Sequence, residues 1–352
     1  MTGIVVRELQ ATDEQRMLAL REEVADGGQV RFATRHHVPY LQAVRSLHPD
    51  STCVVAQTPE GRVVGAAWVR FGRWIRSGAD ADYGLLHSLA VHPDFRRRGI
   101  ARAMTDWRLD LVDRRRAELG REVTAVATIQ RGNTASLANA RRWATWIGGE
   151  LTVRPVPMRR VRPRARAGWQ VRPATEDDLD VIAGRLAQRY QDFAMAPAAG
   201  RTWLSGWLVQ RVATVVGLNT YLVVTDRSGR LLAGLGVVDE PRLSDLRVVA
   251  MPPAMKVAAR SLGLVRSGGI MRNLPAVLAW HRPDSLAAAN HLWQSARWSY
   301  RRHGTALVTT TDVRDPITAM TAAPGWLPST SITLAIRTNR ELDDGGLLAV
   351  PH

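Results

Sequence analysis

Short apolar runs alternate with longer amphipathic segments over the first 160 residues. The runs are rich in β-branched residues and predict strands near residues 4–9, 52–57, 62–71, 83–92, 123–129 and 151–161. The amphipathic segments predict helices between about residues 13 and 47, at 99–119 and at 133–146. Strands that alternate with helices in this way indicate an α/β fold with a mixed sheet.

The segment 99–119 shows the helical period most clearly. Its apolar side chains recur at the spacing of one helix face, at positions Ile100, Met104, Trp107, Leu111 and Val112. This helix directly follows the strand predicted at 83–92 and a short basic loop.

The chain divides near residues 161–168, where apolar residues are scarce and Pro163 and Gly168 occur. We predict a first domain at 1–161, a basic linker at 162–168, a second domain at 169–338 and a tail at 339–352, in which 341–346 is expected to be loosely ordered. Two sequence echoes indicate that the second domain is a duplicate of the first. The start 169–180 resembles residues 5–13, and LAWHRPD at 278–284 resembles LAVHPD at 89–94.

Composition excludes several classes of protein. The 352 residues suffice for two cores, and no stretch approaches the roughly 18 apolar residues of a membrane span. The start lacks the pattern of a secretory signal, so we expect a cytoplasmic protein. A single cysteine, Cys53, leaves no internal disulfide and no cysteine-based metal site, and its apolar neighbours predict a core position. We expect no metal.

The charge is strongly basic and uneven. The chain has 48 Lys+Arg against 32 Asp+Glu, a net charge of +16, and Lys256 is its single lysine. Residues 1–168 hold 28 arginines and 17 acidic residues, or +11, and the rest of the chain carries +5. Five arginines fall within 159–166, and others cluster at 96–98, 114–116 and 141–142. Such clusters suit a solvated linker or a polyanionic partner.

The run RRRGIA at 96–101 carries the clearest chemistry. It joins a strand to a helix, and a helix N-terminus offers free backbone N–H groups and a positive dipole. Gly99 lets the backbone approach a ligand closely, Ala101 keeps the next position small, and the arginines add charge-assisted hydrogen bonds. We predict a pyrophosphate site here.

These residues resemble the signature of the GNAT (N-acetyltransferase) superfamily, [Gln/Arg]-x-x-Gly-x-[Gly/Ala], preceded by a Leu-Ala-Val-His-Pro strand end. The resemblance is close over residues 1–161 and faint over 169–338, so it implies two tandem GNAT-like domains of which the second is degenerate. It also implies acetyl-CoA or another acyl-CoA as donor and a small-molecule or peptide amine as acceptor. The cofactor-binding residues it implies are Leu89, Ala90, Val91, Arg96, Arg97, Arg98, Gly99, Ile100, Ala101, Arg102 and Asn133.

Two positions concern catalysis. Many family members have a tyrosine acid seven residues after the asparagine, where this chain has Ala140. The stretch 87–92 resembles the histidine-containing strand of arylalkylamine N-acetyltransferases, which makes His87 the candidate base; the alternative is a buried strand histidine. His92 is expected to cap or pack under the loop. Asn133 is either a donor contact, an N-cap, or both.

The second unit lacks the phosphate loop, since Asp284 leads directly into a helix at SLAAA. We therefore expect no donor site there, and its Trp293 and Trp298 are expected in the core. His36 and His37 lack companions for a metal site.

Three functions remain open from the sequence. The first is acyl transfer from acyl-CoA to an amine. The second keeps the fold but takes its acyl group from an aminoacyl-tRNA or an acyl carrier protein, which the basic charge favours. The third is a CoA- or nucleic-acid-binding module without catalysis.

Overall fold

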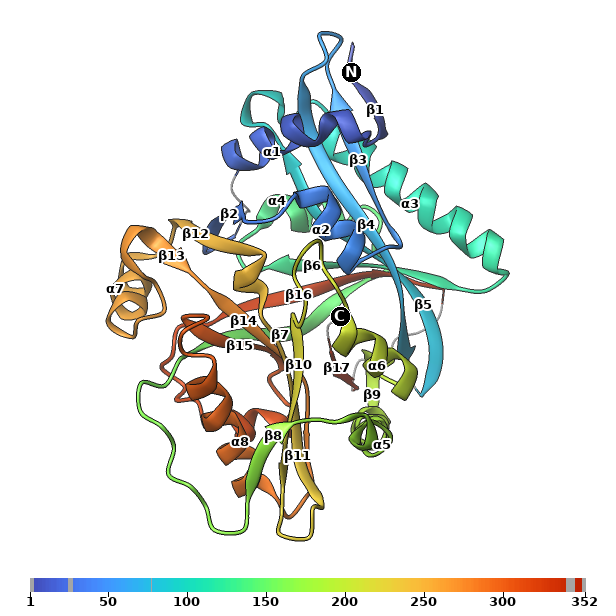
Figure 1. Cartoon of the computed structure of the whole chain (residues 1–352). Coiled ribbons are helices and arrows are strands. Elements are labelled where there is room, and N and C mark those ends of the chain that lie inside the picture. Colours follow the sequence, from blue (N-terminus) through green and yellow to red (C-terminus); the bar gives the residue numbers. More distant parts are fainter. Residues whose placement is uncertain (1–2, 25–27, 77, 340–345, 350–352) are drawn as a thin grey trace.

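The computed structural model describes residues 3–24, 28–76, 78–339 and 346–349. Strands and helices alternate in both halves, and one mixed sheet passes through the whole molecule (Figure 1). The predicted α/β class is confirmed. Within the described residues, no helix has the length and apolar character that a membrane crossing requires.

The first half contains the helices α1 (Glu14–Glu23), α2 (Tyr40–Leu47), α3 (Ile100–Leu119) and α4 (Thr134–Ala140). Its strands are β1 (Val5–Glu8), β2 (Arg31–His36), β3 (Ser51–Gln57), β4 (Val63–Arg76), β5 (Ala79–Val91), β6 (Val123–Gln130) and β7 (Trp146–Pro157).

The second half contains the helices α5 (Leu179–Tyr190), α6 (Arg201–Val209), α7 (Pro253–Ser261) and α8 (Leu286–Ser299). Its strands are β8 (Gln170–Pro173), β9 (Phe193–Pro197), β10 (Asn219–Thr225), β11 (Leu231–Val238), β12 (Ser244–Ala250), β13 (Ile270–Met271), β14 (Asn273–His281), β15 (Ala306–Asp312), β16 (Thr330–Arg337) and β17 (Leu347–Leu348).

Each half contributes one strand to the sheet of the other half. The main sheet has the order β1-β3-β4-β5-β6-β16-β7-β15-β14-β11-β10-β8. Strand β16 of the second half lies antiparallel beside β6, and β7 of the first half lies antiparallel beside β15. Each half therefore supplies a strand that the other needs to cover an edge of its sheet.

The duplication suggested by the sequence extends to individual contacts. Arg7 binds Asp13 at 2.7 Å in the first half, and Arg172 binds Asp178 at 2.5 Å in the second. Both carboxylates close a capping box at the start of a helical segment. Ser88 in β5 and Leu278 in β14 also share a left-handed backbone, with φ of 53° and 52°.

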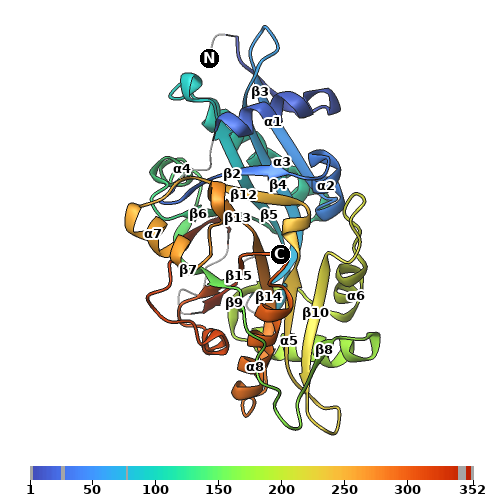
Figure 2. The same cartoon turned by 60° about the vertical axis from the view of Figure 1, so that its left-hand side comes forward.

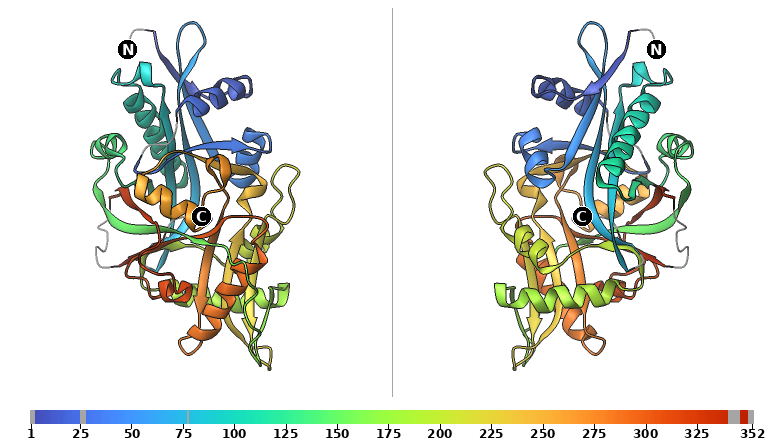
Figure 3. Two further views of the ribbon diagram at one scale, coloured as in Figure 1. Left: turned by 90° about the vertical axis from the view of Figure 1, so that its left-hand side faces the viewer. Right: turned by 90° about the vertical axis from the view of Figure 1, so that its right-hand side faces the viewer.

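Helices cover both faces of the first half of the sheet, as the two views in Figure 3 show. Alternate residues of β3 point to opposite faces, so Val54 packs with Ile100 and Met104 of α3 while Val55 packs with Met17 of α1. Cys53 lies in the α1 cluster, buried and unpaired, which confirms its predicted core position.

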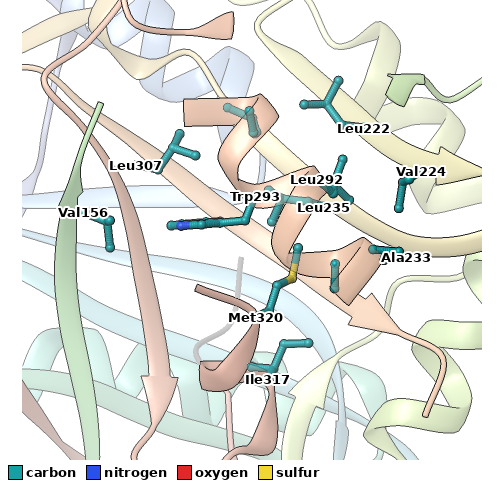
Figure 4. Packing of buried hydrophobic residues seen from close by; sticks show 14 of the residues in the cluster. Val156, Leu222, Val224, Ala233, Leu235, Leu292, Trp293, Leu307, Ile317 and Met320 are labelled. Carbon is teal, nitrogen blue, oxygen red and sulfur yellow. The ribbon is translucent and has the colours of Figure 1, made fainter. Parts of the chain in front are cut away.

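The core of the second half forms around α8. Trp293 is 1% exposed and packs among residues of β10, β11 and β15 (Figure 4). Val156 of β7, a first-half residue, belongs to the same cluster (Figure 4). The strand exchange thus joins the two cores as well as the sheet edges, and the predicted core role of Trp293 is confirmed.

A second, small sheet of order β13-β12-β2 crosses the main sheet, with α7 beside it (Figure 2). Its strand β2 lies in the region where the sequence indicated helices alone. That prediction was wrong because the partner of β2 is β12, more than 200 residues away, and such pairing leaves no local signal.

One other predicted boundary was wrong. The helix expected at 133–146 ends at Ala140, and the chain enters β7 at Trp146 because this segment pairs with β16. In the tail, Leu347–Leu348 pairs with β9 as a short strand, and residues 340–345 and 350–352 lie outside the described part, so the loose order expected at 341–346 stays a prediction. The predicted domain borders stay a prediction.

The strand exchange predicts that the first half is unstable alone. A fragment of residues 1–168 lacks β16, which exposes the edge of β6 and the apolar groups that Leu334, Ala335 and Ile336 cover, each 0% exposed. We expect this fragment to aggregate or to lack near-ultraviolet circular dichroism, and co-expression with residues 169–352 to restore a folded complex. A fragment that unfolds cooperatively by itself would contradict the proposed dependence.

Candidate functional site

Strands β5 and β6 separate part of the way along the sheet. They pair in parallel from Asp82 with Val123 to Leu85 with Val126, and this pairing then stops although both strands continue. At Ser88 the backbone becomes left-handed, and the register between β4 and β5 shifts between Ala66 and Trp68. Such a bulge bends the strand. It leaves a split between the end of β5 and the end of β6.

The basic loop lies directly above this split, between β5 and α3. Gly99 is the N-cap of α3 with a left-handed φ of 79°, and Arg97 is also left-handed, with φ of 60°. The first turn of this 20-residue helix contains no acidic residue. No side-chain carboxylate in this turn offsets the positive end of the helix dipole, and three exposed arginines precede it, an arrangement that attracts phosphate.

The predicted phosphate-site residues are close together. Arg96, Arg97, Arg98, Gly99 and Arg102 are exposed, whereas Ile100 is buried under the loop and Ala101 is half-buried. Nε of Arg96 donates to the Val91 carbonyl at 3.1 Å, and Nη2 of Arg98 donates to the Asp94 carbonyl at 2.9 Å. These two bonds hold the loop in place.

His92 caps the turn that begins the loop, as predicted. It is 9% exposed, caps a short 3₁₀ turn at Pro93–Phe95 and accepts from the Asp94 amide at 3.3 Å. Its Nε2 lies 2.9 Å from Glu23 and 2.9 Å from a nitrogen of Arg62. The residue is therefore a structural part of the loop.

A buried polar network fixes α3 against its neighbours. Arg108, 2% exposed, donates to the Trp68 carbonyl at 3.1 Å and to Thr105 Oγ1 at 3.1 Å. Asn139 of α4 donates to the same hydroxyl at 2.9 Å. Burial lowers the pKa of Arg108 to about 10. Sequence reasoning missed this network, because an arginine inside an amphipathic helix gives no sign that it is buried.

The split opens into a cavity of about 510 Å³. Its wall near the split includes Ser88 and Leu89 of β5, Thr128 of β6, and Asn133 and Ser136 at the start of α4. Its lining also includes residues from β2, β12, α7 and β15, so it extends under the small sheet. Of the residues implied by the sequence, His87, Leu89 and Asn133 line this cavity, and Ala90 and Val91 continue β5 toward the loop.

His87 lies on β5 at the bulge. Its Nδ1 is 3.1 Å from the Ser88 hydroxyl, and its ring stacks on Trp68 at a centroid distance of 6.5 Å. Burial, reinforced by the positive charges of Arg70 and Arg108, lowers the pKa of His87 well below its usual value. The imidazole is therefore neutral at pH 7, the form that can accept a proton.

Asn133 and Ala140 mark the two ends of α4. The side chain of Asn133 accepts from the Ser136 amide at 3.1 Å, which confirms the predicted N-cap. Ala140 lines the cavity and is 2% exposed. It offers no proton at the position where many GNAT proteins have a tyrosine.

The second half has no equivalent loop. After β14, Ser285 becomes the N-cap of α8 without an intervening arginine run. The region beside the bulge at Leu278 encloses about 150 Å³, with Trp293 in its wall. Within the described ranges, no group of three His, Cys, Asp or Glu side chains is arranged to hold a metal ion.

Comparisons with known proteins agree with this geometry. Residues 17–143 match the family model of the acetyltransferase (GNAT) family. No curated protein matches the sequence.

Solved structures match the whole fold. N-myristoyltransferase of Saccharomyces cerevisiae, solved with myristoyl-CoA, has a TM-score of 0.62 at 10% identity, covering 96% of this chain and 84% of the other. A tandem GNAT protein of the clavulanic acid biosynthesis pathway has a TM-score of 0.60 at 15% identity, covering 97% and 100%. A GNAT protein of Kribbella flavida has a TM-score of 0.51 at 12% identity, covering 94% and 70%.

The capping role of Asn133 can be measured. Replacing Asn133 with Ala removes the acceptor for the Ser136 amide and should lower the free energy of unfolding by about 1 kcal/mol. Asn133→Asp keeps a capping oxygen and should lose less. Urea denaturation followed by circular dichroism measures both. Equal stability of Asn133→Ala and the wild type would show that the cap contributes nothing.

Proposed function

Since residues 17–143 match the GNAT acetyltransferase family and the chain has the fold of a tandem GNAT protein, we propose that it transfers an acyl group from acyl-CoA to an amine. One observation carries the proposal: a basic helix N-terminus, a split between parallel strands and a cavity follow one another in a continuous path. A nucleotide pyrophosphate, a pantetheine arm and an acyl group have the same order along acyl-CoA.

In this proposal the loop binds the donor's pyrophosphate. The amides from Arg97 to Arg102 and the exposed guanidinium groups supply hydrogen bonds and positive charge. The main chain at Leu89, Ala90 and Val91 holds the arm, since β5 has no strand partner on its β6 side beyond Leu85. Backbone N–H groups there polarise the thioester carbonyl. Asn133 contacts the arm while it caps α4.

His87 acts as the base. The amine attacks the thioester carbonyl, its proton passes to the neutral imidazole, and the C–S bond breaks to release the CoA thiolate. Because Ala140 cannot donate a proton, we propose that the thiolate takes its proton from solvent or from the imidazolium of His87. Arg70 and Arg108 disfavour that imidazolium electrostatically, which makes it a good proton donor.

The phosphate loop can be tested by charge reversal. Arg97→Glu places a carboxylate at the proposed pyrophosphate site and should weaken CoA binding by about 10- to 100-fold, the range for one charged hydrogen bond. Arg114→Glu makes the same charge change near the other end of α3, where the side chain is exposed. Isothermal titration with CoA measures both variants. Equal effects of the two would mean that the binding reflects net charge alone.

The role of His87 predicts a pH dependence. Because its pKa is lowered, the base stays neutral as the pH falls below 6.5, and the rate should decline only at lower pH, where the imidazole becomes protonated. His87→Gln should reduce kcat by about 10²- to 10⁴-fold and remove this acidic limb. Release of free CoA from acyl-CoA, followed over a panel of amines, measures both. An unchanged pH–rate profile in His87→Gln would exclude the base.

The exposed linker arginines favour a second candidate, a donor carried by a polyanion such as tRNA or an acyl carrier protein. Arg162, Arg164 and Arg166 are exposed, as is Arg160 just before the linker. The linker lies at the opposite end of the molecule from the start of α3 (Figure 1), so these arginines are not part of the phosphate loop. Mass spectrometry of the purified protein at low and high salt separates the candidates. Co-purified acyl-CoA without RNA or carrier protein supports the main proposal, and salt-sensitive RNA supports the second.

A further inference from the structure

The cavity at the split is much longer than the split itself. Its lining includes residues from six adjacent strands of the main sheet, β5, β6, β16, β7, β15 and β14. Paired strands lie about 4.8 Å apart, so the four spacings from β6 to β14 cover roughly 19 Å, and the split between β5 and β6 adds to this length. The small sheet and α7 roof its far part, which we call the chamber. The chamber-lining residues of the roof and the elements next to it are Phe32, Leu246, Met251, Met255, Ala259, Leu264 and Met271.

The chemistry of the lining changes along this length. Near the split it is rich in amide and hydroxyl groups, among them Ser88, Asn133 and Asn139. In the chamber it consists mainly of aliphatic and thioether side chains, with Asn273 of β14 as a polar exception. Among the described residues that line the cavity there is no carboxylate, and the two ionisable groups, His87 and Arg108, belong to the first half near the split.

We propose that the chamber holds the hydrocarbon chain of a medium- or long-chain acyl group, so that the donor is a fatty acyl thioester rather than acetyl-CoA. This inference rests on the proposed function and specifies its acyl group. A polar arm followed by an apolar chain has the same order of chemistry as the cavity. An acetyl group has three heavy atoms and would fill only a small part of about 510 Å³.

The chamber suits a chain better than it suits an amine acceptor. A protonated amine inside it would lose its hydration without a carboxylate to replace it. Each buried methylene of an alkyl chain instead gains from leaving water. The methionines at 251, 255 and 271 are flexible and polarisable, so they can adapt to chains that differ in length or bend.

Equilibrium binding to the full chain tests the proposal without knowledge of the acceptor. Isothermal titration would compare CoA with acetyl-, octanoyl- and dodecanoyl-CoA, each below its critical micelle concentration. We expect octanoyl- and dodecanoyl-CoA to bind at least about tenfold more tightly than acetyl-CoA, since several methylenes become buried. Acetyl-CoA and CoA should differ little.

Two matched pairs of variants locate the chain. Leu246→Trp fills the chamber from β12, and Val249→Trp adds the same side chain to an exposed position on that strand. Met255→Trp and Val257→Trp form the same pair on α7. The chamber variants should lose the preference for long chains while their affinity for CoA stays unchanged, which also verifies that they fold. The exposed variants should behave as wild type.

The outcomes separate this inference from the proposed function. If CoA itself does not bind, the proposed function fails, and the chain-length inference fails with it. If CoA and acetyl-CoA bind but affinity does not rise with chain length, the chamber inference is overturned while the proposed function stands. It is also overturned if acyl chain length has no effect on turnover but alkyl chain length on the amine does, because the chamber then holds the acceptor.

Discussion

The separation of β5 from β6 is the constraint on which the rest of the site depends. Because β5 bends at Ser88, the part of β6 that follows Val126 no longer pairs with β5. Residues 127–130 are then held in the sheet through β16, which pairs with them from Ile332 to Ala335. The split can stay open while β6 remains ordered, because β16 of the second half pairs with the other edge of β6.

This arrangement gives the second half a function even though it lacks a phosphate loop. Through β16 it supports one wall of the split, and through β12 and α7 it covers the chamber. The first half in turn supplies β7 to the second sheet and Val156 to its core. The cavity at the split is therefore lined by both halves, and neither half encloses it alone.

Charge and polarity change along the path from the basic loop into the cavity. The loop between β5 and α3 concentrates positive charge at the surface, where it can meet phosphate without being desolvated. Deeper inside, the charges of Arg70 and Arg108 together with burial keep His87 neutral. Beyond His87 the lining is mainly aliphatic and thioether, with Asn273 and Thr330 as polar exceptions. The same path therefore changes from cationic to neutral polar to apolar, as an acyl thioester does from one end to the other.

The sequence by itself determined the features that depend on neighbouring residues. The basic loop with Gly99 before a helix, the helical period from Ile100 onward and the paired starts at 5–13 and 169–180 are local, so the order of residues alone reveals them. Other features depend on contacts between residues far apart in the chain. These are the strand β2, the hydrogen bonds from Arg108 to Trp68 and from Asn139 to Thr105, the exchange of β7 and β16, and the chamber. Only the tertiary structure decided these, because a residue's propensity carries no information about which distant strand or helix it will meet.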